Sequence, residues 1–374
     1  MYHLACLLIL AYVLTRFLLP LRIALGWKIA AAAAFAAGAM NRWWSLLLFG
    51  DMFSPELPGW MILFFGWLFG LSLFLALLCL VGELIGLAVW LWRGKEDAAA
   101  LLHRWRMVSG LAAFALATAG AINGAKVPQV TRVTVATQGL PAEFEGFRIV
   151  QLSDLHISPL LGQAWVREVV ARSNALRPDL VVVTGDVIDG TVEKRRADTE
   201  PLRELKARHG VLASLGNHEY YFDADRWSHR LMELGMGVLR NQRLILTIGE
   251  QHLVVAGTED EAALDFGHSG PDAPLALASI DPGYAIVLLR HRPTGIAQSQ
   301  KLGVDLQLSG HTHGGMVLGL DRVVAAANEG MVSGLYRRGT TNVYVSNGTG
   351  IWNGFLTRLG RPAEITEITL VRAP

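Results

Sequence analysis

Charged residues are sparse in the first third of the chain and frequent in the rest. Residues 1–122 contain 13 of the 65 charged residues, whereas residues 123–374 contain the other 52. A hydrocarbon layer of about 30 Å is crossed by a helix of about 20 apolar residues. Four segments have this character, at 2–20, 26–49, 60–92 and 107–122. We therefore predict a transmembrane region of about four spans over 1–122 and a soluble catalytic domain over 123–374.

The charge balance and the cysteine content exclude several classes of function. The chain has 33 basic and 32 acidic residues, so it lacks the basic excess of a nucleic-acid-binding protein. Cys6 and Cys79 both lie in apolar runs, which excludes a disulfide framework and a cysteine metal site. The expected partners are membrane lipids and no nucleic acid, and the sequence leaves the oligomeric state open.

The third apolar segment leaves the topology open. Residues 60–92 are long for one span and short for two spans with a turn, and a hairpin here would invert the topology. Glu83 lies inside this segment, where an acid is costly enough to suggest a function, but the sequence indicates no basic partner. The first segment lacks a basic start and an A-x-A site, so we predict that it is not a cleaved signal peptide.

Basic residues predict the orientation in the membrane. With four spans, the connections 1–2 and 3–4 lie on one side, and they carry most of the basic residues, which favours the cytoplasm. These residues are Arg16, Arg22, Lys28, Arg93, Lys95, Arg104 and Arg106. The domain after residue 123 then lies on the outer side of a multi-pass protein.

From about residue 126 the pattern becomes that of a soluble α/β domain. The apolar run at 147–153 is followed by a helix-like segment and by a second run at 179–186, which is a βαβ pattern. Further runs that end in glycine or polar residues occur at 210–217, 253–260, 285–291, 305–311 and 342–348. Open α/β sheets bind ligands beyond the carboxyl ends of their strands, so a site is expected there.

The side chains at these strand ends are of metal-binding types. In chain order they are Asp154, His156, Asp186, Asn217, His218, Glu219, His291, His311 and His313. Carboxylate, amide and imidazole groups bind divalent ions, and two ions about 3.5 to 4 Å apart need a bridging carboxylate. Each motif alone has a simpler interpretation, such as a turn or two rings on one face of a strand. Together, in this order, they predict a metal centre.

Five motifs resemble the calcineurin-like metallophosphoesterase superfamily, in particular its bacterial membrane-linked branch. They are SDLHIS, TGDVID, GNHEYY, LLRHRP and SGHTHGG, and the similarity extends over about 140–374, including the tail YVSNGTG. It implies an α/β sandwich that binds two divalent metal ions, with Mn, Fe and Zn as the candidates. It also implies a location in the bacterial inner membrane, where the orientation predicted from the basic residues places the catalytic domain in the periplasm or outside the cell. Residues 1–122 lie outside the resemblance.

The resemblance further implies a role for each residue of the site. Asp154, His156 and His313 would hold the first ion, Asp186 would bridge, and Asn217, His291 and His311 would complete the second site. His218 would protonate the leaving group or stabilise the phosphoryl oxygens. Asp189 would orient His218, although a turn-forming or helix-capping role is an equal alternative. Glu219 would stand outside the ligand set, and Gly310, Gly314 and Gly315 would leave space for the phosphate.

The chain is therefore expected to be a membrane-anchored, metal-dependent phosphoesterase that cleaves a phosphoester or pyrophosphate bond with water. The stretch between the last span and the first catalytic strand is short, which favours a phosphorylated lipid as substrate. One alternative is a UDP-diacylglucosamine-type pyrophosphatase on the cytoplasmic face. Another is a non-catalytic membrane sensor or scaffold, which the presence of His218 disfavours. Met316 and Asn347 depart from the family pattern and are expected to affect substrate preference.

Overall fold

The computed structural model describes residues 2–373, and the chain divides into two compact units. The helical unit comprises Met1–Ala125 together with Asn353–Leu359, and the sandwich unit comprises Lys126–Trp352 and Gly360–Pro374. The first division thus falls three residues after the boundary predicted from the sequence. The short segment Asn353–Leu359, which sequence analysis places in the soluble domain, belongs structurally with the helices.

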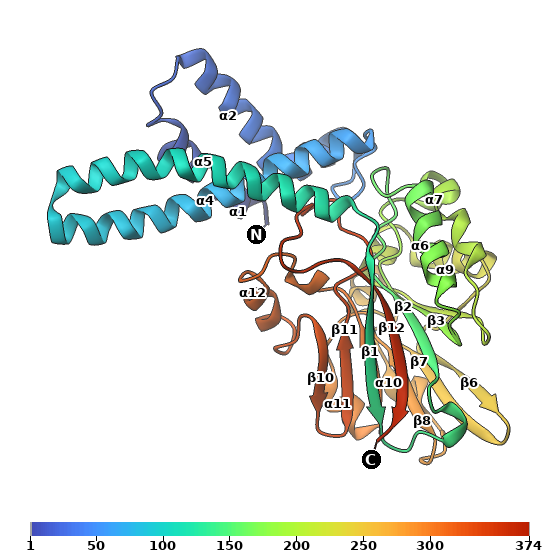
Figure 1. Cartoon of the computed structure of the whole chain (residues 1–374). Helices are drawn as coiled ribbons and strands as arrows, with labels where there is room; N and C mark the ends of the chain where they lie inside the picture. The colour runs from blue at the N-terminus through green and yellow to red at the C-terminus, as the bar shows by residue number, and fades with distance from the viewer. Residues whose placement is uncertain (1, 374) are drawn as a thin grey trace. The chain divides into compact units, whose positions relative to one another are not determined.

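Two long helices dominate the helical unit. Helix α4 spans Gly59–Arg93 and α5 spans Lys95–Ala125, and both are long and apolar enough to cross a membrane. They pack along each other and are joined at Gly94, whose φ of 94° suits glycine (Figure 1). The segment 60–92 is therefore one continuous helix and not a hairpin.

The other two predicted spans differ from expectation. Helix α1 spans Tyr2–Val13 and continues as a π-helical turn over Leu14–Leu18, while 26–49 forms two helices, α2 (Leu25–Ala39) and α3 (Asn41–Phe49). The break lies at Met40, whose φ of −102° and ψ of 18° lie outside the helical region. The 15 residues of α2 rise only about 22 Å. Two helices, α4 and α5, are therefore candidates to cross a membrane in place of the four predicted spans, and in 26–49 apolar composition did not detect the break.

Small residues and one ion pair join the helices of this unit. A side chain at Gly82 of α4 would overlap the indole of Trp105 of α5, so glycine permits this close approach. At the next residue of α4, Glu83 pairs with Arg16, with 2.5 Å between Oε1 and Nε. The sequence indicates no basic partner for Glu83, and the structure shows that Arg16 of the earlier segment Leu14–Leu18 is this partner.

The sandwich unit consists of two six-stranded sheets (Figure 1). In sheet order, the first contains β1 (Gln129–Thr137), β12 (Glu364–Arg372), β2 (Arg148–Leu152), β3 (Leu180–Thr184), β4 (Val211–Ser214) and β5 (Met236–Val238). The second contains β10 (Gly334–Arg338), β11 (Thr341–Val345), β9 (Leu306–Ser309), β8 (Ala285–Leu289), β7 (Gln251–Gly257) and β6 (Gln242–Ile248). The predicted α/β fold is confirmed.

The sheets pack face to face around an apolar core. Ile149 and Val182 of the first sheet and Val255, Val287 and Leu308 of the second belong to one buried cluster. The covering helices are α6 (Gln163–Ala175), α7 (Val192–Thr199), α8 (Asn217–Tyr221), α9 (Ala224–Glu233), α10 (Ala273–Ala276), α11 (Ile296–Lys301) and α12 (Asp321–Ala326). Strands β2, β3 and β4 are parallel, as are β7, β8 and β9, so within each group the carboxyl ends point the same way.

Candidate metal centre

The predicted ligands occupy the loops that follow these parallel strands. Asp154, Asp186, His291 and His311 each stand two residues beyond the end of a strand, namely β2, β3, β8 and β9. Asn217 follows β4 at the start of α8. Polar groups lie at this edge because the apolar residues of each run form the buried strand and the polar residues come directly after it. The structure brings the predicted ligands together there.

Backbone strain accompanies these positions. Five of the seven predicted ligands have a left-handed φ, between 44° and 67°, a region that residues other than glycine rarely adopt. They are Asp154, His156, Asp186, His311 and His313. Such conformations cost on the order of 1–3 kcal/mol each and cluster at functional sites, where the surrounding structure maintains them. Strain at so many neighbouring residues indicates that they are held for the position of their side chains.

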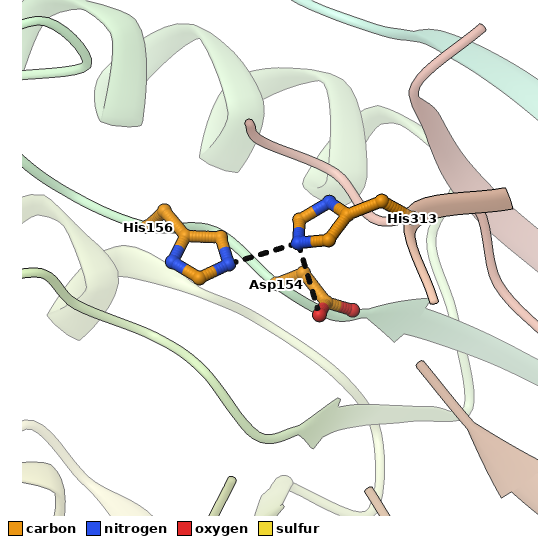
Figure 2. A group of neighbouring side chains, drawn as sticks. All are labelled: Asp154, His156 and His313. Carbon is orange, nitrogen blue, oxygen red and sulfur yellow. Dashed lines mark hydrogen bonds and ion pairs between the residues drawn. The ribbon is translucent and has the colours of Figure 1, made fainter. Parts of the chain in front are cut away.

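The first group of ligands is Asp154, His156 and His313. Figure 2 shows the three side chains pointing toward one another. The Nε2 atoms of His156 and His313 lie 3.0 Å apart, and His313 Nε2 lies 3.5 Å from Asp154 Oδ1. Two imidazole nitrogens and a carboxylate oxygen that converge on one point suit a divalent ion.

The second group is Asp186, His291 and His311, whose ligand atoms lie within 4.8 Å of one another. His291 Nδ1 lies 2.7 Å from the carbonyl oxygen of Thr184 and therefore donates its proton to it. In the neutral ring, which is the form that binds a metal ion, Nε2 then carries the lone pair, and this atom lies 3.2 Å from Asp186 Oδ2. Among the described residues, the buried Oδ1 of Asn217 has no hydrogen-bond partner. Acceptors that face one another in a buried site fit a cation.

Asp186 lies between the two groups. Its Oδ2 atom is 3.2 Å from His291 Nε2 in the second group and 3.8 Å from His156 Nε2 in the first. Burial would raise the pKa of Asp186, but the imidazoles of His291, His218 and His156 hold it well below its usual range. One ionised oxygen thus faces ligands of both groups, as a bridging carboxylate must.

His218 and Asp189 lie beside the first group. Asp189 Oδ1 is 2.6 Å from His218 Nδ1 and 3.0 Å from His156 Nδ1, so one carboxylate contacts both imidazoles. Burial alone would lower the pKa of His218, but the charges of Asp186 and Asp189 raise it to about 9. The residue that caps α7 is Thr191, not Asp189. Asp189 is therefore placed to orient a predicted metal ligand as well as His218.

Glu219 has a structural role that sequence analysis did not specify. Its Oε2 accepts hydrogen bonds from the backbone N–H groups of Asp186 (3.0 Å) and Gly216 (2.7 Å), and its Oε1 accepts one from Val187 (2.7 Å). Burial, together with the charge of Asp186, raises the pKa of Glu219 to about 7. Glu219 ties the loop after β3 to the loop after β4. Its place three residues into α8, where an acid completes a capping box, is a signal for this role.

The glycines of the last motif lie close against neighbouring side chains. A Cβ atom at Gly310 would overlap the side chains of Ser153 and Asp154, one at Gly314 would overlap Asn347, and one at Gly315 would overlap Asp321. These glycines therefore leave room for neighbouring protein, which at Gly310 includes the predicted ligand Asp154. Asn347 is itself buried and donates from Nδ2 to the carbonyl oxygen of Pro362 at 3.1 Å, so it supports the loop of His313.

The chain after β11 borders the same site. The backbone N–H of Gly350 donates to the carbonyl oxygen of Asp154 at 2.9 Å, and Thr349 donates to Ser153 at 2.7 Å. The indole of Trp352 meets the imidazole of His218 edge-on, with 6.3 Å between ring centroids. The ring of Tyr221 lies 5.1 Å from the same imidazole. Two aromatic rings therefore flank His218. Tyr221 is the last residue of the motif GNHEYY, whereas Trp352 lies outside the five motifs.

Comparison with known proteins identifies the family. The profile described as Calcineurin-like phosphoesterase matches residues 147–315, which include every predicted ligand. The metallophosphoesterase YkuE of Bacillus subtilis is 32% identical over 275 residues, which cover 71% of this chain and 94% of YkuE. The chain belongs to the calcineurin-like metallophosphoesterases. This confirms the resemblance inferred from the five motifs and makes the chain a member of a family of metal-dependent hydrolases.

Other relatives are longer. A zebrafish protein named "Transmembrane protein with metallophosphoesterase domain" is 35% identical over 267 residues, which cover 69% of this chain but only 61% of that protein. The chain therefore spans about three fifths of the length of this relative. Among solved structures, the 5'-nucleotidase precursor of Thermus thermophilus has a TM-score of 0.37 at 16% identity, and the match covers 60% of this chain and 54% of that one.

Proposed function

We propose that this metallophosphoesterase hydrolyses a phosphoester or pyrophosphate bond by direct attack of water. The observation that carries the proposal is the position of Asp186, whose Oδ2 faces His156 of one ligand group and His291 of the other. Two divalent ions held there would supply a water of lowered pKa and would offset the charge of the phosphate. Manganese, iron and zinc all suit this set of carboxylate, amide and imidazole ligands.

The residues around the ligands complete the proposed mechanism. Asp189 holds Nδ1 of His218, so Nε2 is the nitrogen available to substrate. A protonated imidazole in this position donates a proton to the departing oxygen, which is the role of a general acid. Glu219 keeps the loops of Asp186 and Asn217 together, so the ligands need no rearrangement when substrate binds. No covalent intermediate is needed in this scheme.

We further propose that the substrate is a phosphorylated lipid and that membrane lipids surround the helical unit. Three observations support this proposal. Helices α4 and α5 are long and apolar enough to cross a membrane, and relatives carry the name transmembrane protein. Only residues 126–128 lie between the end of α5 and the start of β1. Three residues reach about 10 Å at most, so a short tether would raise the effective concentration of membrane-embedded substrate.

A comparison of lipid and soluble substrates tests this proposal. We expect the full chain, reloaded with Mn, Fe or Zn, to show a kcat/KM at least about 100-fold higher for a lipid phosphate in mixed micelles than for its soluble headgroup, as tethering predicts. Phosphatidic acid and glycerol 3-phosphate form one such pair, and lipid diesters and lipid pyrophosphates form the others. Equal values for every pair would exclude a lipid-specific enzyme and leave a general phosphoesterase held at the membrane.

The hairpin of α4 and α5 also carries a topology proposal. Arg93 and Lys95 flank its tip, and Arg104 and Arg106 follow, which favours the cytoplasm for the tip. Since both ends of a two-span hairpin lie on the opposite side, the sandwich unit would lie outside the cytoplasm of a bacterial cell, whether or not α1 and α2 cross the membrane.

Reporter fusions test the topology. A reporter that is active only outside the cytoplasm should work when it is fused after residue 374 and should fail when it is inserted at Gly94. A cytoplasmic reporter should give the reverse pattern at the two positions. Cytoplasmic activity at the carboxyl end would contradict the proposal and would favour the UDP-diacylglucosamine-type pyrophosphatase, whose substrate is reached from the cytoplasmic face.

A further inference from the structure

The segment Asn353–Leu359 leaves the sandwich unit and returns to it. It belongs with the helices, although residues up to Trp352 and from Gly360 onward belong to the sandwich. The two units are therefore joined by chain at three points, after Ala125, after Trp352 and after Leu359. A membrane anchor needs only the first of these connections. The other two call for a different explanation.

Glycines of the two long helices receive this segment. A Cβ atom at Gly120 of α5 would lie 2.5 Å from Cγ2 of Thr357, and one at Gly70 of α4 would lie 2.8 Å from Oγ1 of the same residue. Gly66, one turn earlier in α4, leaves room for Leu356 in the same way. The backbone N–H of Arg358 donates to the carbonyl oxygen of Gly120 at 3.1 Å. The segment is thus seated by side-chain packing and by a backbone hydrogen bond.

Both ends of the segment border the candidate metal centre. Its first neighbour in the chain is Trp352, whose ring lies 6.3 Å from that of His218. Two residues earlier, Gly350 is hydrogen-bonded to the carbonyl oxygen of the predicted ligand Asp154. At the other end, Gly360 pairs with Val317, four residues beyond the predicted ligand His313. The chain on either side of the segment therefore lies beside the site, and the Trp352 ring is the part that faces His218.

We propose that Asn353–Leu359 is a positioning segment, through which the helical unit sets the place of the Trp352 indole beside His218. This inference rests on the proposed function, because it assigns the segment to the step in which His218 assists the leaving group. A general acid must lie within hydrogen-bond reach of the departing oxygen, and a displacement of about 1 Å can cost a factor of about 100. The helical unit is then a part of the catalytic apparatus as well as an anchor.

Adding a methyl group at position 120 and removing one at position 357 tests the proposal. Gly120→Ala introduces a methyl group against Cγ2 of Thr357, and Thr357→Ser removes that Cγ2 while keeping the hydroxyl. The full chain, loaded with its metals, is assayed with phenyl phosphate, which has a poor leaving group, and with 4-nitrophenyl phosphate, which has a good one. The diester pair of the same two phenols replaces them if the enzyme prefers diesters.

We expect Gly120→Ala to lower kcat for the phenyl ester about 10-fold or more and kcat for the nitrophenyl ester less than about 2-fold, because only the poor leaving group depends on the acid. Metal content should not change. The double variant Gly120→Ala/Thr357→Ser should recover most of the loss, which is the coupling expected of residues in contact. Gly26→Ala is the matched control, since a Cβ atom at Gly26 meets nothing within 4 Å and α2 keeps its helix.

Three results would overturn the proposal. These are unchanged kinetics in Gly120→Ala, equal losses on both esters, or a double variant that is no better than the single one. If Gly120→Ala does not fold, Trp352→Leu gives the same test from within the sandwich unit, and the same selective loss on the phenyl ester is expected. Failure of the proposed function itself would be recognised separately, as a wild-type protein that hydrolyses none of the aryl esters and none of the lipid monoesters, diesters and pyrophosphates named above with any metal, and it would overturn both inferences.

Discussion

The variant Asp186→Asn is expected to lose almost all hydrolytic activity and part of its metal. Its carboxylate lies between the two ligand groups, 3.2 Å from His291 and 3.8 Å from His156. An amide in this place is neutral, so it offers no charge to offset two neighbouring cations. Loss of a residue that only hydrogen-bonds a metal ligand typically lowers metal affinity or activity about 10- to 100-fold. Loss of the bridging carboxylate should therefore lower activity more than about 1,000-fold.

Metal analysis and kinetics together check this prediction. Wild-type protein is expected to hold two ions per chain after dialysis and the variant fewer. Asp281→Asn serves as the control, since Asp281 is exposed and its carboxylate accepts a hydrogen bond only from a nearby backbone group among the contacts described for it. If Asp186→Asn kept two ions and normal turnover, the bridging role would have to be assigned to another residue.

The position of the site could be predicted because strands and ligands have a simple relation in the sequence. Each apolar run forms a buried strand, and neighbouring parallel strands end at one edge of their sheet. Asp154 and Asp186 of the first sheet therefore had to come close together, as did His291 and His311 of the second. Some contacts that refine the site could not be predicted in this way. The additional contact of Asp189 with His156 depends on the path of the loop after β3. Loops have no regular spacing of apolar residues, so the sequence does not predict their path.

The helical unit shows a second limit of sequence reasoning. Apolar composition predicts that a segment prefers a lipid-like environment, but it does not predict where a helix breaks, as at Met40. Nor does it predict partners that are distant in the chain. Glu83 finds Arg16, 67 residues away, and Gly120 receives Thr357, 237 residues away. Such pairs are set by tertiary packing, so only the structure reveals them.

Replacement of His218 by alanine is expected to separate catalysis from metal binding. The imidazole adjoins both ligand groups, yet in the proposed mechanism it acts on substrate, so metal content should stay at the wild-type level. Turnover of a substrate with a poor leaving group should fall by about 10² to 10⁴, the range for loss of a general acid. Turnover of the nitrophenyl ester should fall far less, since that leaving group departs without a proton. His229→Ala, at a side chain that is 74% exposed, is the matched control.

The pH profile gives an independent check on the role of His218. Burial would lower its pKa, but Asp186 and Asp189 raise it to about 9, and bound cations would lower it from there. An acid must be protonated to act, so activity on the phenyl ester should be present below this pKa and should be lost as the pH rises through it. The wild-type profile is therefore expected to have an alkaline limb at or below about pH 9 that is absent from His218→Ala. An identical limb in both proteins, or equal losses on good and poor leaving groups, would show that His218 is not the acid and that it acts on the phosphoryl oxygens instead.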